Sequence, residues 1–108
     1  MDCEKYSKIY ESIKDTTNSS LKNDLILYAI RYARIRVDWY REDFEHRKEL
    51  EETRRRAHNA FIDSINILSR NMAKAGENIS WRNKLGNDRK EIGDFACFIH
   101  FYLGLEAR

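Results

Sequence analysis

The sequence predicts an all-α protein, a helical bundle of four main helices with a short extra turn before the last one. The 108 residues contain no proline, and the four glycines all lie after residue 75, so residues 19–75 lack both of the strongest helix breakers. Charged residues make up 35% of the chain, and many are Glu, Lys and Arg, which favour helix. Apolar residues recur at spacings of three and four, the period of a helix with a buried side.

The first helix is expected over residues 2–16 and the second over residues 20–47. The second helix carries two apolar seams on nearly opposite sides. One seam comprises Ile26, Ile30, Ala33, Val37, Tyr40 and Phe44, and the other comprises Leu21, Leu25, Tyr28, Tyr32, Ile35 and Trp39. A helix that is apolar on two sides must be covered on two sides. We therefore expect a second subunit, or the first and last helices, to cover the second seam.

Residues 45–56 are polar apart from Leu50, and the seam that ends at Phe44 loses its register there. We expect a break or tight turn in this stretch, with one continuous long helix as the alternative. The third helix is expected over residues 51–75, with Gly76 as a left-handed cap. A single turn at 81–85 and a last helix at 88–105 follow. The expected core stripes are Phe61, Ile65, Leu68 and Met72 in the third helix, and Ile92, Ala96, Ile99 and Leu103 in the last.

Length and composition indicate one soluble domain, residues 1–108, in the cytoplasm. The net charge is only +2, which does not indicate that the whole chain binds nucleic acid. No apolar run approaches the roughly 18 residues of a membrane span, and the charged N-terminus lacks the apolar core of a signal peptide. Cys3 and Cys97 form no disulfide or zinc pattern, so we expect free thiols, no metal and no cofactor.

Three segments, AHNAFID at 57–63, SWR at 80–82 and DRKEIGDF at 88–95, carry a resemblance to known proteins. They resemble a family of small uncharacterised bacterial helical proteins. The resemblance covers about half of the chain and contains no catalytic motif. It implies a bacterial or phage protein of the cytoplasm, and it supplies no activity.

The connector before the last helix is basic and contains Trp81. Its candidate binding residues are Trp81, Arg82, Lys84, Arg89 and Lys90. Basic groups beside an exposed aromatic ring can hold a nucleic-acid backbone and stack a base. We favour the alternative, in which Trp81 closes the open end of the core and its indole N–H is hydrogen-bonded.

Three polar residues are candidates for burial: Arg36, Asp94 and His100. Arg36 points between the two seams of its helix. Either its stem packs while its head reaches solvent, or its guanidinium pairs with Asp94, with Asp63 or with a ligand anion. His100 belongs to a stripe with Gly93, Cys97 and Gly104, and these small residues predict the close approach of another helix backbone. We expect His100 to lie at the edge of that contact with its hydrogen bonds satisfied.

Arg41 and His46 have the arginine-x4-histidine spacing of the HEPN ribonucleases, which are small helical dimers. The resemblance covers six residues, and Glu42 stands where that family often has Asn, Asp or His. It implies that Arg41 and His46 would act on an RNA phosphate and 2′-hydroxyl. Such a site requires both side chains in one solvent-reachable cleft.

The sequence as a whole favours a non-catalytic helical association module that forms a homodimer, since two seams on one helix give more apolar surface than a chain of this length needs. Another protein partner is a further expectation. The alternative function is contact with RNA or DNA, including a HEPN-like nuclease in which Arg41 and His46 are catalytic.

Overall fold

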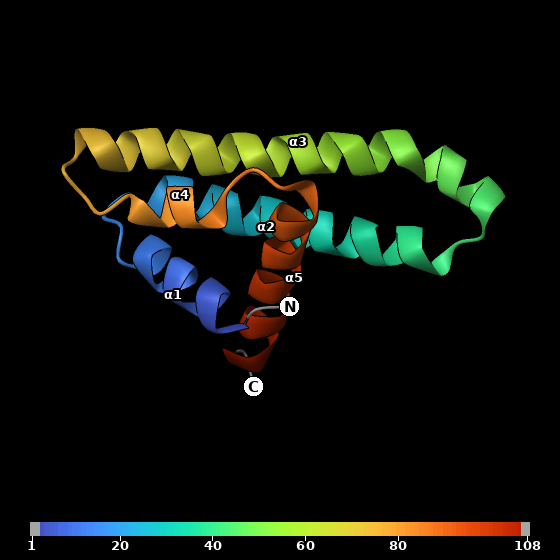
Figure 1. The fold of residues 1–108 in the computed structure, drawn as a ribbon, viewed down its shortest axis with the longest axis horizontal. Helices are drawn as coiled ribbons and strands as arrows, with labels where there is room; N and C mark the ends of the chain where they lie inside the picture. Colours follow the sequence, from blue (N-terminus) through green and yellow to red (C-terminus); the bar gives the residue numbers. More distant parts are fainter. Residues whose placement is uncertain (1–2, 107–108) are drawn as a thin grey trace.

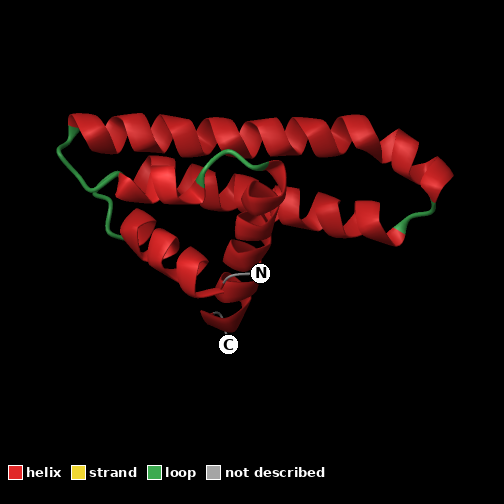
Figure 2. Cartoon of the chain, viewed as in Figure 1, coloured by secondary structure: helices red, strands yellow, loops and turns green. Residues whose placement is uncertain are grey.

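The computed structural model describes the backbone of residues 3–106 and the side chains of residues 3–103. The helices are α1 (Cys3–Lys14), α2 (Ser19–Arg41), α3 (Phe44–Lys74), α4 (Ser80–Leu85) and α5 (Arg89–Glu106) (Figure 1). The described residues contain no strand (Figure 2). The predicted all-helical class is therefore confirmed, and α4 is the expected extra turn. Asp2, the expected start of α1, lies outside the described residues.

Two long helices, α2 and α3, form an antiparallel pair that sets the dimensions of the molecule. At about 1.5 Å per residue, the 31 residues of α3 span about 46 Å. The longest dimension of the whole molecule is 47 Å. One end of the pair extends beyond α5 as an arm, which consists of residues 37–57 (Figure 1).

The turn between α2 and α3 consists of Glu42 and Asp43, and it differs from our expectation of a break within residues 45–56. That stretch is continuous helix, and α3 begins at Phe44. The Asp43 side chain caps α3 by accepting a hydrogen bond from the His46 N–H at 3.0 Å. Arg47 reaches back across the turn and donates to the Trp39 and Tyr40 carbonyls, which lie at the end of α2. Capping therefore makes a tight turn without glycine or proline.

One face of the α2–α3 pair packs against α1, α4 and α5, and the hydrophobic core lies there. α5 crosses the pair steeply, and α1 packs beside it (Figure 1). Aromatic rings link these two helices, with the Tyr6 and Phe95 centroids 5.7 Å apart and those of Tyr10 and Tyr102 5.4 Å apart. The expected stripes are buried except for Leu103, which is half-buried, and the fully buried residues include Phe61, Ile65, Leu68, Met72, Trp81, Leu85, Ile92, Ala96 and Ile99.

The two seams of α2 have different environments. The second seam is only partly covered: α3 packs on Tyr32 and Trp39, whereas Leu21, Tyr28 and Ile35 stay half-buried. Tyr32 is buried against Phe61, and the Trp39 ring lies between the guanidinium groups of Arg47 and Arg54, at 4.7 and 4.6 Å. The first seam contributes Ala33 to the core but loses its cover along the arm, where its last members, Val37, Tyr40 and Phe44, are exposed.

Glu77 fastens the loop between α3 and α4 to the turn between α1 and α2. Its carboxylate accepts hydrogen bonds from the Thr16 hydroxyl at 2.6 Å and from the Thr17 N–H at 2.9 Å. These bonds hold the pKa of Glu77 below its ordinary value. Gly76, with a φ of +72°, is the left-handed residue that the sequence predicted at the end of α3.

Trp81 is 1% exposed and closes the core, as the favoured interpretation of the connector predicted. We predict that Trp81→Ala lowers the free energy of unfolding by about 3–5 kcal/mol, because it leaves a large cavity. Urea denaturation measures the loss, and Ser80→Ala at the neighbouring exposed position is the control. A loss below about 1 kcal/mol, typical of a surface substitution, would show that Trp81 does not support the core.

Candidate functional site

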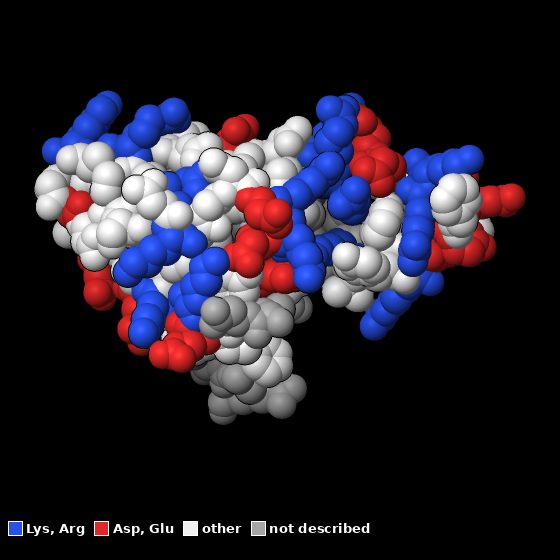
Figure 3. Space-filling model, viewed as in Figure 1, with Lys and Arg blue, Asp and Glu red and all other residues white. Residues whose placement is uncertain are grey.

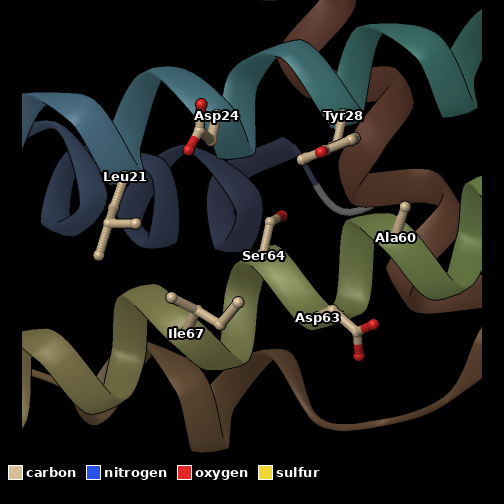
Figure 4. A pocket seen from close by; sticks show the side chains of 7 residues that line it. All are labelled: Leu21, Asp24, Tyr28, Ala60, Asp63, Ser64 and Ile67. Atoms are coloured by element: carbon tan, nitrogen blue, oxygen red, sulfur yellow. The ribbon is translucent and has the colours of Figure 1, made fainter.

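A groove runs between α2 and α3 on the face of the pair that is turned away from α1, α4 and α5. In Figure 4 the two long helices form its walls, and the other helices lie behind them. We call this surface the open face. One half of the groove is lined by Leu21, Asp24, Tyr28, Ala60, Asp63, Ser64 and Ile67. The other half is lined by Tyr28, Arg31, Ile35, Thr53, Arg56, Ala57 and Ala60.

The floor of the groove is apolar and built partly from small residues, because α2 and α3 approach each other closely at Ala57, Ala60 and Ser64. Tyr28 and Ile35 are only half-buried there. Leu27 and Ile67 are 45% and 43% exposed. An apolar centre with charged residues around it is the usual composition of a surface that binds another protein.

Charges of opposite sign occupy the two halves of the groove. Asp24 and Asp63 line one half, on opposite rims in Figure 4, and Arg31 and Arg56 line the other. The Arg31 guanidinium lies 5.8 Å from the centre of the Tyr28 ring. Arg56 donates to Glu52 within α3 at 3.0 Å, and this pair is exposed, so water screens it strongly.

The sequence analysis expected a second subunit, or the first and last helices, over the seam that contains Tyr28 and Ile35, but it did not identify this groove. The groove exists only because two helices far apart in sequence align side by side.

A polar cluster lies where α2 crosses α5, and of its predicted members Arg36 is buried whereas Asp94 is half-buried. The Arg36 side chain is buried, and its Nη1 donates to Asp94 Oδ1 at 2.9 Å and to Cys97 Sγ at 3.6 Å. Burial opposes the charged form of Arg36, but the bonds to Asp94 and Cys97 outweigh it and raise the pKa of Arg36. Of the sequence alternatives for Arg36, the structure has the pairing with Asp94.

Gly93, in the small-residue stripe on α5, lies where α2 packs against α5. It faces the Arg36 guanidinium, and a Cβ on Gly93 would lie 2.8 Å from Arg36 Cζ. The absence of a side chain at Gly93 therefore makes room for the ion pair of Arg36 with Asp94. His100 is exposed and so is not one of the buried polar residues. The burial of Gly104 lies outside what the structure describes.

The five predicted residues of the connector do not form one binding surface. Trp81 is buried, and its indole N–H has no acceptor among the described residues, contrary to our expectation. Arg82 donates inward to the Asn66 side chain at 2.9 Å and to the Gly86 carbonyl at 2.8 Å. The other three predicted residues, Lys84, Arg89 and Lys90, are exposed.

Arg41 and His46 lie on either side of the turn at the end of the arm, and both are exposed. His46 Nδ1 lies 2.8 Å from Asp43 Oδ1, and this hydrogen bond raises the pKa of His46 above its ordinary value. The grooves described in this structure do not include either residue.

Other kinds of site find little support. Within residues 3–103, His, Cys, Asp and Glu side chains do not gather in threes, as a metal site would need. Both cysteines are free thiols, and they line one groove with Phe98 and Phe101. Among the described helices, none combines the length and apolar character that crossing a bilayer requires.

Comparisons with known proteins add no relative: no family model, curated protein or solved structure matches the chain.

The close contact at Gly93 yields a two-part prediction. Gly93→Ala should lower the free energy of unfolding by about 1–3 kcal/mol, because the new methyl group displaces the guanidinium from Asp94. In an Arg36→Ala background the same change should be neutral, or stabilising by up to about 1 kcal/mol, because alanine favours helix more than glycine does. Equal effects of Gly93→Ala in the two backgrounds, measured by urea denaturation, would exclude this role for Gly93.

Proposed function

We propose that this chain is a non-catalytic helical-bundle association module of the cytoplasm that acts as a homodimer. The observation that supports this proposal is the open face. Three helices cover one side of the α2–α3 pair, whereas the groove on the other side is lined only by residues of α2 and α3.

The composition of the open face favours a protein partner. Its exposed and half-buried apolar residues run along both helices, and they are Leu21, Leu27, Tyr28, Ile35 and Ile67. Covering such residues on association removes apolar surface from water, which is the main driving force of most protein–protein contacts. Helix positions also hold these side chains in place, so that little ordering is needed on binding.

The size of the open face suits a dimer. The 23 residues of α2 span about 35 Å, and two adjacent helices, each about 10 Å wide, make a face about 20 Å wide, so it offers about 700 Å² per chain. Stable interfaces typically bury about 800 Å² per partner, and the two values are close.

Contact with RNA or DNA is the second candidate. Its support is the exposure of Lys84, Arg89 and Lys90, and of Arg41 and His46 at the end of the arm. Against it, Trp81 and Arg82 are engaged inside the protein. The densest basic run, residues 54–56, pairs with Glu51 and Glu52. Figure 3 shows basic and acidic side chains interspersed along the molecule on the face opposite the groove.

We predict that light scattering gives a mass near twice the 13.0 kDa of one chain at micromolar concentration. Ile67→Asp should raise the dimer dissociation constant at least about tenfold, because a buried isoleucine contributes about 1.5–3 kcal/mol. Ile79→Asp is the matched control, because Ile79 is exposed to a similar extent but lies in the loop before α4.

A mass of 13.0 kDa at every concentration up to the solubility limit would refute the homodimer. Equal weakening by Ile67→Asp and Ile79→Asp would refute the open face as its surface. Salt-sensitive oligonucleotide binding by a monomeric chain would favour the second candidate.

A further inference from the structure

The charges of the open face are arranged with a symmetry that identifies how a second copy would bind. On α2, Asp24 and Arg31 are seven residues apart, and on α3, Arg56 and Asp63 are also seven residues apart. Seven residues are close to two helical turns, so each pair lies on one side of its helix.

The midpoints of these two pairs lie next to each other. The midpoint on α2 falls between Leu27 and Tyr28, and the midpoint on α3 falls between Asn59 and Ala60. Tyr28 and Ala60 line both halves of the groove, so they mark its centre. Each half of the groove therefore has one sign of charge, at equal distances from a common centre.

The pattern continues along α3 with the same spacing. Glu49 precedes Arg56 by seven residues, and Arg70 follows Asp63 by seven. Both residues are exposed. The order of charges on α3 is thus negative, positive, centre, negative, positive. Turning this helix end over end places each of these four charges opposite one of the other sign.

We propose that the partner on the open face is a second copy of this chain, bound about a two-fold axis that passes by Tyr28 and Ala60. This inference rests on the proposed homodimer and specifies its geometry. The axis lies in the interface and perpendicular to the helices, so α2 packs antiparallel on α2 and α3 antiparallel on α3. Asp24 then faces the partner's Arg31, and Asp63 faces the partner's Arg56. Glu49 faces the partner's Arg70, and every such contact occurs twice.

The charges exclude the other face-to-face arrangement. An axis parallel to the helices would place α2 on the α3 of the second copy, with the same end of the two molecules together. Asp24 would then meet the partner's Asp63, and Arg31 would meet the partner's Arg56. Like charges opposed across an interface cost several kcal/mol, so only the perpendicular axis suits this face.

The charged groups are available for these contacts. Within the described residues, Asp24 and Asp63 take part in no ion pair. Arg31 packs on Tyr28, and Arg56 is held only by its exposed pair with Glu52. Exchanging such a screened pair for a contact with the partner loses little energy.

A charge-reversal experiment tests the arrangement in the full chain. A basic variant carries Asp24→Lys and Asp63→Lys, and an acidic variant carries Arg31→Glu and Arg56→Glu. Each variant alone should dimerise at least about a hundredfold more weakly than the natural chain, because like charges then meet across the interface. Mixed in equal amounts, the two should form a heterodimer, because every contact again joins opposite charges.

Matched controls change the same net charge elsewhere on exposed positions: Glu11→Lys with Asp15→Lys, and Lys84→Glu with Lys90→Glu. Both control variants should dimerise as the natural chain does, and circular dichroism checks that all four variants fold. Light scattering and native mass spectrometry measure the masses.

The outcomes separate the two proposals. If the natural chain dimerises and both charge variants still dimerise alone, the homodimer stands and this arrangement is wrong. If the variants are monomeric and mixing them restores no heterodimer, the arrangement is also wrong. A natural chain that stays monomeric overturns the proposed homodimer together with this inference, and leaves the open face to another partner.

Discussion

The antiparallel pairing of α2 with α3 is the constraint on which the rest of the structure depends. These helices hold 54 of the 108 residues, 23 in α2 and 31 in α3. The other three helices hold 36, with 12 in α1, 6 in α4 and 18 in α5. So few residues cover one face of a pair that is about 46 Å long, and they leave the other face and the arm without a layer of helix. The same chain length that completes a core therefore leaves a surface for association.

Helical periodicity predicted most of the fold because it depends on which residues face the core. The stripe Phe61, Ile65, Leu68 and Met72 is buried in full, and Gly76 ends α3 as expected. The turn between α2 and α3 was placed too late, because its position depends on Asp43 as a cap and on Arg47 reaching across the turn. The Arg47 contact is between two helices, so no pattern within one helix indicates it. The sequence left the cover of the second seam open for a related reason, since a seam shows that a helix is covered but not by which neighbour.

The candidate sites were predictable to different degrees. Pairing of Arg36 with Asp94 was one of the alternatives, because a guanidinium between two apolar seams needs a partner. That Gly93 makes room for this pair was not predictable, because the crossing of α2 and α5 decides what faces the glycine. The groove of the open face was not identified, although a second subunit was one of the covers expected for the seam that contains Tyr28 and Ile35. The spacings of Asp24, Arg31, Arg56 and Asp63 are present in the sequence, but they acquire a common centre only when Tyr28 and Ala60 are known to lie side by side.

The central claim is that the open faces of two chains meet about one two-fold axis. Distances between spin labels on α3 test this claim most directly. In a Cys3→Ser, Cys97→Ser background, single cysteines at Glu45, Asn59 and Lys74 each give one distance across the dimer. Glu45 and Lys74 are equally far from the midpoint beside Ala60, so the account predicts the same distance for both, about 45 Å. Labels at Asn59 should lie within about 15 Å of each other, close to the spacing of packed helices. Unequal distances at Glu45 and Lys74, or a distance at Asn59 longer than either, would contradict the account.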